Sequence, residues 1–185
     1  MDRIARVFIL CLAAFLAGCS SMKPEDFAQS TPRFQLERYF AGQTRAWGMF
    51  IDRFGTVKRQ FVVDLDGQVT GNRLVLTEDF RYDDGETERR VWTIDRIDEH
   101  TYEGRAADVV GVARGRSFGN ALNWTYTMDM KVGDGTLRVN FDDWMFQQDG
   151  EVLLNRAEVS KFGVTLGQVQ IFFRKPPPQQ AMAAE

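Results

Sequence analysis

The amino-acid sequence predicts an all-β protein, an antiparallel up-and-down β-barrel with one short helix ahead of its first strand. Two observations carry this prediction: strict alternation of apolar and polar residues, and Asp-Gly pairs that recur between β-rich runs. About nine or ten strands with short connections fit between Thr44 and Lys175. A meander of that size closes most simply into a barrel, and a two-sheet β-sandwich is the alternative architecture.

The clearest alternation lies in NALNWTYTMDM, residues 120–130. Leu122, Trp124, Tyr126 and Met128 share one face of such a strand, because successive side chains point to opposite faces. The Asp-Gly pairs are typical of tight hairpin turns, since glycine reaches the backbone angles that these turns need. They stand at 66–67, 84–85, 134–135 and 149–150. We therefore expect consecutive hairpins along the chain.

The N-terminus combines positive residues, an apolar run and a cysteine. Arg3 and Arg6 precede VFILCLAAFLA, which is short for a bilayer span, and the residues LAGC follow, ending at Cys19. This order resembles the bacterial lipoprotein signal, in which the cysteine is lipidated and becomes the new N-terminus. By the same resemblance, Ser20 after the cysteine places the anchor in the outer membrane, facing the periplasm. An ordinary secretory signal with a chance cysteine is the alternative.

The remaining chain divides by composition. The short helix is expected in TPRFQLERYFAG, with Thr31 as its N-cap, Pro32 as its first residue and Gly42 as its stop. The polar, proline-rich C-terminus has nothing to pack and should be disordered. The expected segments are a signal peptide at 1–18, a tether at 19–32, a barrel domain at 33–175 and a disordered tail at 176–185.

Composition also argues against several kinds of site. The formal net charge is −3 with interspersed signs, so we expect no nucleic-acid partner. Cys11 lies inside the predicted signal and Cys19 carries the predicted lipid, so the mature domain keeps no free thiol. The single histidine, His100, falls in a predicted loop, and no metal-ligand spacing or catalytic motif is present. We therefore expect no cofactor and no metal, and we disfavour an enzyme without excluding one.

Register arithmetic places charged residues on an otherwise apolar face. A two-residue turn at 133–134 sets Trp124 opposite Asp143, after three apolar pairs on the same face. A two-residue turn at 149–150 then sets Asp143 opposite Arg156. The predicted interior therefore contains an acid–base pair.

A second hairpin repeats this pattern. A three-residue loop at 83–85 sets Glu78 opposite Arg90, again among apolar partners. Buried charges need partners, so one interpretation is a structural ion-pair network that fixes register. The other is a cavity whose polar groups meet the head of an amphiphile. Arg114 and Arg116 share one strand face and are further candidates for that polar end, opposite the small residues at Ala113 and Gly115.

Six apolar residues are the candidates for lining the interior, because they share the predicted inward faces. They are Trp92, Trp124, Tyr126, Met128, Phe141 and Leu154.

Several stretches together resemble a family of bacterial lipoproteins classed as domain of unknown function 3833. They are YFAGQTRAWGMFIDRFGTVKRQF, VWTI, ADVVGVARGRSFGNALNWTY, FDDWMF, LNRAEVSKFG and FFRK. The runs at 119–122 and 142–144 are the most specific, and the likeness extends from about Phe34 to Lys175. The resemblance implies a lipid-anchored envelope protein with a lipocalin-like or calycin-like barrel. It carries no catalytic or binding residue over to this chain.

The expected function is an outer-membrane-anchored periplasmic lipoprotein that binds a hydrophobic or amphiphilic small molecule, similar to a lipid or fatty acid. One alternative is a structural or assembly lipoprotein with a packed barrel and a protein partner. A weaker alternative is an enzyme acting on lipid-derived substrates. The sequence leaves the first two open, because a small barrel can be filled by side chains or can hold one ligand.

Overall fold

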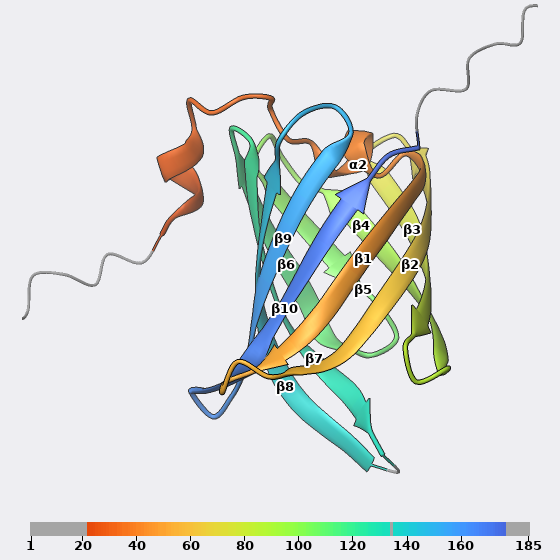
Figure 1. Ribbon diagram of the computed structural model, residues 1–185. Helices are drawn as coiled ribbons and strands as arrows, with labels where there is room; N and C mark the ends of the chain where they lie inside the picture. Colours follow the sequence, from red (N-terminus) through yellow and green to blue (C-terminus); the bar gives the residue numbers. More distant parts are fainter. Residues whose placement is uncertain (1–21, 134, 177–185) are drawn as a thin grey trace, which may run out of the picture.

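The computed structural model describes residues 22–133 and 135–176. The predicted signal peptide, Cys19 and residues 177–185 of the predicted tail lie outside the described residues. Within the described chain, antiparallel strands follow one another around a closed barrel, and β1 pairs with β10 to close it (Figure 1). The barrel prediction is confirmed, and closure excludes the sandwich. The strands are β1 (Gly42–Asp52), β2 (Val57–Thr70), β3 (Arg73–Tyr82), β4 (Thr87–Arg96), β5 (Thr101–Arg105), β6 (Val109–Phe118), β7 (Ala121–Val132), β8 (Gly135–Gln147), β9 (Val152–Lys161) and β10 (Val164–Arg174).

The short helix is present, but it begins later than expected. It is α2 (Leu36–Tyr39), with Gln35 at its N-cap, so the prediction of Thr31 as cap and Pro32 as first residue is wrong. The reason is a tertiary contact: the backbone N–H of Phe34 donates to the carbonyl of Gly119 at 2.7 Å, which holds the preceding chain against the barrel. Gly42, expected to stop the helix, has a φ of 70° and is the first residue of β1.

The helix α2 covers one end of the barrel. Its residues Leu36 and Tyr39 are buried, as is Phe40 behind it, whose ring packs edge-on against Phe173 at 5.5 Å. Gly67 of β2 permits this approach, because a Cβ there would lie 1.8 Å from the carbonyl oxygen of Phe40. This end of the barrel is therefore closed by tight packing.

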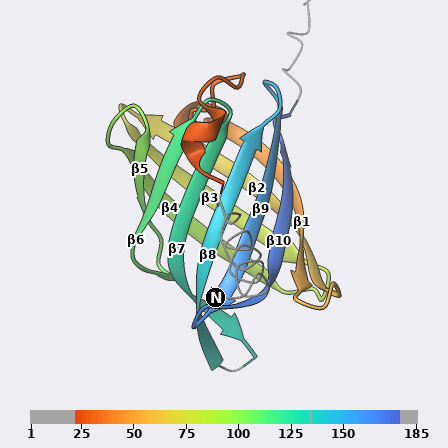
Figure 2. The ribbon, with the colours of Figure 1, turned by 90° about the vertical axis from the view of Figure 1, so that its left-hand side faces the viewer.

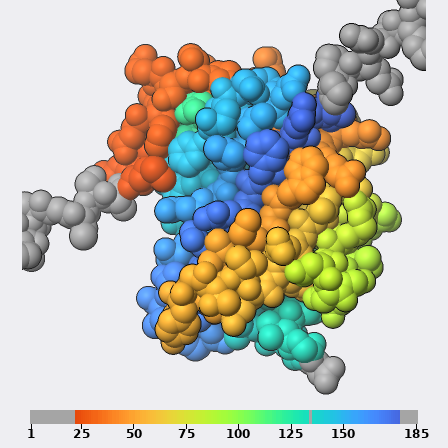
Figure 3. Space-filling model, in the orientation of Figure 1, coloured from red at the N-terminus to blue at the C-terminus, as the bar shows by residue number. Residues whose placement is uncertain are grey.

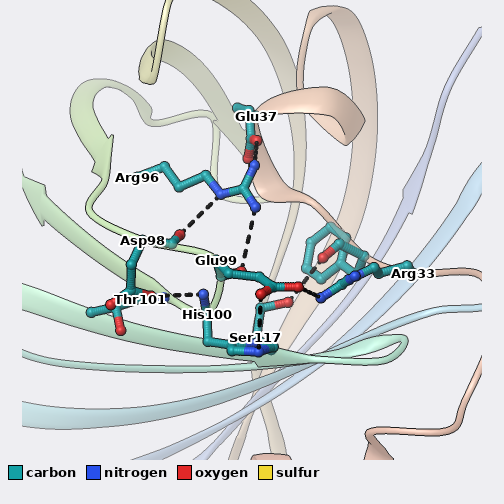
Figure 4. Close-up of polar contacts among 9 residues, drawn as sticks. Arg33, Glu37, Arg96, Asp98, Glu99, His100, Thr101 and Ser117 are labelled. Carbon is teal, nitrogen blue, oxygen red and sulfur yellow. Dashed lines mark hydrogen bonds and ion pairs between the residues drawn. The ribbon is translucent and has the colours of Figure 1, made fainter.

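A polar network ties α2 to the strands beneath it (Figure 4). The carboxylate of Glu37 accepts hydrogen bonds from Arg96 at 3.0 Å and from the hydroxyl of Tyr102 at 2.9 Å. The hydroxyl of Ser117 donates to the carbonyl of Phe34 at 2.9 Å. These bonds satisfy polar groups that closure buries, so the closed end is held by more than apolar contact.

A 3₁₀ helix, η1 (Pro24–Phe27), lies in the segment predicted to be a tether. It packs on the outer wall of the barrel (Figure 2). The ring of Phe27 lies 5.2 Å from that of Phe146 and 6.1 Å from that of Trp144 on β8. Arg116 of β6 pairs with Glu25 at 2.7 Å. The chain that leads back toward Cys19 is thus attached to the side of the barrel.

The outer surface of the barrel is continuous over β1, β2, β9 and β10 (Figure 3). In the part of the chain that the structure describes, no helix has the length and apolar character needed to cross a membrane.

Candidate functional site

A cavity of about 710 Å³ occupies the barrel interior. Leu36 and Phe40 bound it at the end covered by α2. At the opposite end, from which the β7–β8 hairpin projects, its lining includes the exposed residues Glu86, Glu88 and Lys131 (Figure 1). The cavity therefore reaches solvent at that end and is closed at the other.

Aromatic and methionine side chains form much of the cavity wall, including five of the six apolar residues predicted to face inward. The ring of Trp92 lies 5.8 Å from that of Trp124 and 5.5 Å from that of Tyr126, edge to face in both pairs. Tyr126 stacks on Phe141 at 4.9 Å, and Met128 is buried beside them. Such walls suit an apolar or aromatic ligand surface.

The wall around Trp124 depends on two glycines of neighbouring strands. A Cβ on Gly115 of β6 would lie 2.3 Å from the indole ring, and a Cβ on Gly104 of β5 would lie 2.6 Å from it. The small face of β6 therefore points inward. Its other face carries Arg114 and Arg116, so their predicted place inside the barrel is wrong; the side chain of Arg114 is 74% exposed.

Arg90 of β4 is the central cation of the cavity. Its register opposite Glu78 of β3 is confirmed, and their closest N–O distance is 3.8 Å. Two further acids contact the guanidinium, Asp108 at 2.8 Å and Glu88 at 3.0 Å. The face of Phe80 lies 5.2 Å away. Arg90 is thus compensated by three carboxyl groups before any ligand arrives.

Burial raises the pKa of Glu78 to about 7, and the nearby Arg90 only partly opposes this rise. The carboxyl group is buried in the cavity wall, and removal from water disfavours its charged form. Near neutral pH, Glu78 therefore exchanges readily between acid and carboxylate.

Asp143 of β8 also faces the cavity, and its side chain is 6% exposed. Trp124 lies opposite it on β7, as predicted. Burial raises the pKa of Asp143 to about 7, with a hydrogen bond from Tyr126 acting in the opposite direction. Its Oδ1 atom has no hydrogen-bond partner among the described residues. A buried acceptor in this state carries an unmet demand for a donor.

The predicted partner of Asp143 is wrong. Ala157 of β9 lies opposite Asp143, whereas Arg156 lies opposite Trp144 and is exposed. Leu154, predicted to face inward, likewise lies on the outer face and is 42% exposed. The whole of β9 is shifted by one residue from the predicted register, and a shift of one reverses which face every side chain occupies.

The turn explains this shift. Instead of a two-residue turn, Gln148 pairs with Val152 through a 2.9 Å hydrogen bond and leaves a three-residue loop. The carboxylate of Asp149 stabilises that loop by accepting the backbone N–H groups of Glu151 and Val152, both at 2.8 Å. This Asx turn is a local alternative to the tight turns that Asp-Gly pairs usually form.

Several polar residues of the cavity lining were missed in the sequence, among them Asn155, Arg59 and Asp108. Asn155 is buried on the inner face of β9, where its apolar neighbours Leu153, Ala157 and Val159 share its alternation. Arg59 likewise continues the inward alternation of β2. These two positions could have been found from periodicity. Asp108 lies in the connection between β5 and β6, where no periodicity operates.

The arrangement has the features of a small-molecule binding site. Among residues 22–133 and 135–176, no group of three or more His, Cys, Asp and Glu side chains is placed to hold a metal ion. His100 lies outside the cavity, stacked on Phe118 at 3.9 Å, with Nδ1 2.8 Å from the carbonyl oxygen of Ser117 (Figure 4). The site thus offers apolar walls and a few buried polar groups.

Comparison with known proteins places the architecture and the family. The S-type phycobiliprotein lyase from Guillardia theta has a similar fold, with a TM-score of 0.54 and 8% identity. The match covers 84% of this chain and 99% of the lyase, and at this identity it supports the lipocalin-like fold alone. No curated protein matches the sequence. The model of one family matches residues 13–175, and the chain therefore belongs to the proteins of unknown function designated DUF3833.

Proposed function

We propose that this protein is a periplasmic lipoprotein, anchored in the outer membrane through Cys19, whose barrel binds a hydrophobic or amphiphilic small molecule. The observation that carries the proposal is the cavity of about 710 Å³, closed by α2 and reaching solvent at the other end. Small-molecule sites usually have volumes of roughly 300–1,000 Å³, apolar walls and a few placed polar groups.

The composition of the wall favours a lipid-like ligand over a compact polar one. Met128, Met130 and Met145 line the cavity together with the aromatic side chains. Methionine is flexible and polarisable, so it adapts to hydrocarbon chains of different shape. A densely packed barrel would bury these side chains against one another and would leave no such volume.

The anchoring part of the proposal rests on LAGC at residues 16–19. The attachment of η1 to the barrel wall supports it, because only a few residues separate Cys19 from Pro24. A lipid on Cys19 would therefore hold the barrel close to the membrane surface, within reach of ligands that leave the bilayer.

A purified mature chain without its lipid, residues 20–185, provides the test, since it retains every described strand and helix. Native mass spectrometry after periplasmic expression should show a co-purifying lipid-sized mass. An apolar fluorophore should also bind saturably to the extracted protein and quench its tryptophan emission. A single apo mass together with no saturable binding would exclude the ligand-binding function.

One observation favours the rival function, an assembly lipoprotein that binds a protein partner. Trp47, Phe172 and Leu154 are cross-strand neighbours on the outside of β1, β10 and β9, with exposures of 41%, 39% and 42%. Contiguous exposed apolar residues often mark contact surfaces. Replacing all three by serine should leave ligand binding intact if the cavity is the functional site.

A further inference from the structure

The cavity lining contains more acidic than basic residues, six against four. The principal interior cation, Arg90, is already shared by Glu78, Glu88 and Asp108. An anionic ligand would have to compete with these three carboxyl groups for the guanidinium. The interior is therefore a poor environment for a further anion, such as the carboxylate head of a ligand.

Among the described residues, the interior lacks a hydrogen-bond donor for one oxygen of Asp143. It is buried on the inner face of β8, and its Oδ1 atom has no donor within the described chain. The opposite residues on the flanking strands are Trp124 and Ala157, neither of which brings a charge to it. A hydrogen-bond donor on a ligand would satisfy this oxygen, and a positively charged donor would also stabilise the carboxylate.

Aromatic side chains line the same cavity. Trp92 contacts both Trp124 and Tyr126 edge to face, and Tyr126 stacks on Phe141. Carboxylates combined with aromatic rings form a favourable environment for an organic ammonium group, because the ring faces attract cations. The hydrocarbon part of the same ligand would lie along the remaining apolar wall.

We propose that the barrel selects amphiphiles whose polar group is a hydrogen-bond-donating cation, a protonated amine, bound by Asp143 beside Glu78 and Tyr126. Amphiphiles with a carboxylate head are disfavoured at this position. This inference rests on the proposed ligand-binding function and narrows it, because it names the chemistry of the ligand's head.

The rival placement is an anionic head at the mouth of the cavity, where Arg59 and Lys131 lie. Arg59 is largely engaged: its guanidinium lies 2.7 Å from Asp84, 2.5 Å from Glu86 and 3.5 Å from the ring centroid of Tyr82. Its Nε atom has no acceptor among the described residues. Lys131 is exposed, so its attraction for an anion is screened by solvent. The mouth of the cavity therefore attracts the anionic head of a ligand less than the interior attracts a cationic head.

Three amphiphiles with the same hydrocarbon chain test this inference: dodecylamine, dodecanol and dodecanoate, each used below its micelle concentration or solubility limit. Their ability to displace an apolar fluorophore from the mature chain, residues 20–185, is measured at pH 7.5. We expect dodecylamine to bind at least tenfold more tightly than dodecanoate, with dodecanol between them. Tighter binding of dodecanoate, lost in Lys131→Gln, would overturn the inference in favour of the mouth.

Asp143→Asn is the decisive variant, and Asp142→Asn is its matched control, because Asp142 is exposed on the same strand. Losing a charged hydrogen bond should weaken dodecylamine binding about 10- to 100-fold in Asp143→Asn and leave dodecanol binding unchanged. The control should keep the affinity for dodecylamine, although it removes the same charge. An equal loss in both variants would mean that only the overall negative charge attracts the amine.

The outcomes also distinguish failure of the amine preference from failure of the ligand-binding function. Saturable binding of all three compounds with equal affinity would contradict the amine preference and retain the ligand-binding function. If neither the three compounds nor the fluorophore bind saturably, both the amine preference and the ligand-binding function are refuted. If Asp143→Asn does not fold, Glu78→Gln offers a second test in the same cavity, with an expected loss of affinity for dodecylamine alone.

Discussion

Asp143 on β8 lies directly opposite Ala157 on β9. Arg156, which precedes Ala157 in the chain, lies opposite Trp144 and points out of the barrel. The acid is therefore buried without the arginine that the tight-turn register assigned to it. This arrangement places inside the cavity a carboxyl group whose Oδ1 atom has no hydrogen-bond partner among the described residues. It also separates two side chains that would otherwise form a structural ion pair.

The first prediction concerns that separation. Arg156→Met should change the free energy of unfolding by about 0.5 kcal/mol or less, because the side chain is exposed. In a double-mutant cycle with Asp143→Asn, the two effects should add. Urea denaturation of the four proteins measures both quantities. A coupling energy above about 1 kcal/mol would show that the two side chains interact.

The second prediction is a pH dependence of stability. The pKa of Asp143 is raised to about 7 in the folded protein, from 3.8 for the free side chain. The unfolded chain releases this proton at lower pH, so the folded state loses relative stability as pH rises from about 4 to about 7. Each pKa unit corresponds to about 1.4 kcal/mol, so a rise from 3.8 to about 7 predicts a loss of roughly 4 kcal/mol from this group.

Urea denaturation at several pH values tests the effect. Asp143→Asn should flatten the dependence, whereas Asp142→Asn on the outer face should keep it. Glu78, whose pKa is also about 7, should account for much of the slope that remains. Surface acids such as Asp79 and Asp129 have lowered pKa values because they pair with arginines. Their contribution to the pH dependence of stability therefore falls below about pH 4. A stability that rises between pH 4 and 7 would contradict the buried-acid interpretation.

The barrel and two of its hairpins could be predicted from the sequence because local rules decide them. Alternation along β7 sets its faces, and the turn lengths expected from the sequence at 133–134 and 83–85 give the register that β7–β8 and β3–β4 have. Trp124 opposite Asp143 and Glu78 opposite Arg90 follow from these rules alone. The placement of these two acids on the inner face could therefore be predicted from residue patterns.

The remaining features depend on details that residue patterns hide. Asp149 can form either a tight turn or an Asx loop, and only the backbone shows that it forms the loop. That single residue of loop length moved Arg156 and Leu154 outside and Asn155 inside. The contact of Asp108 with Arg90 joins a connection to a strand, and no periodic pattern encodes it.

The third prediction concerns the anchor. If Cys19 is lipidated, the wild-type protein should incorporate a radiolabelled fatty acid and fractionate with outer membranes. Cys19→Ser should abolish the label, because the lipid that carries the fatty acids is attached through the sulfur of Cys19. Cys11→Ser, inside the predicted signal, is the control and should leave labelling unchanged. Label that persists in Cys19→Ser would refute the assignment.

The fourth prediction concerns the closed end. Glu37 accepts hydrogen bonds from Arg96 and Tyr102, so Glu37→Ala leaves two donors without their acceptor in a largely buried place. A loss of about 1–3 kcal/mol is expected. Hydrogen exchange should accelerate in Leu36–Tyr39 more than in β7. Glu99→Ala, on the exposed loop nearby, is the control and should have little effect; equal effects of the two variants would mean that Glu37 does not hold the helix.

The last prediction concerns the space beneath Trp124. Gly115→Ala places a Cβ 2.3 Å from the indole ring, so either the ring or β6 must shift. Overpacking of this kind typically costs about 1–3 kcal/mol. Gly150→Ala is the matched control, because a Cβ at Gly150 would have no other atom within 4 Å, and it should be nearly neutral. Urea denaturation in the Trp124→Phe background completes the test, since the smaller ring leaves room and Gly115→Ala should then cost less by about 1 kcal/mol or more. The same cost in both backgrounds would show that the glycine serves the backbone of β6 and does not make room for the tryptophan.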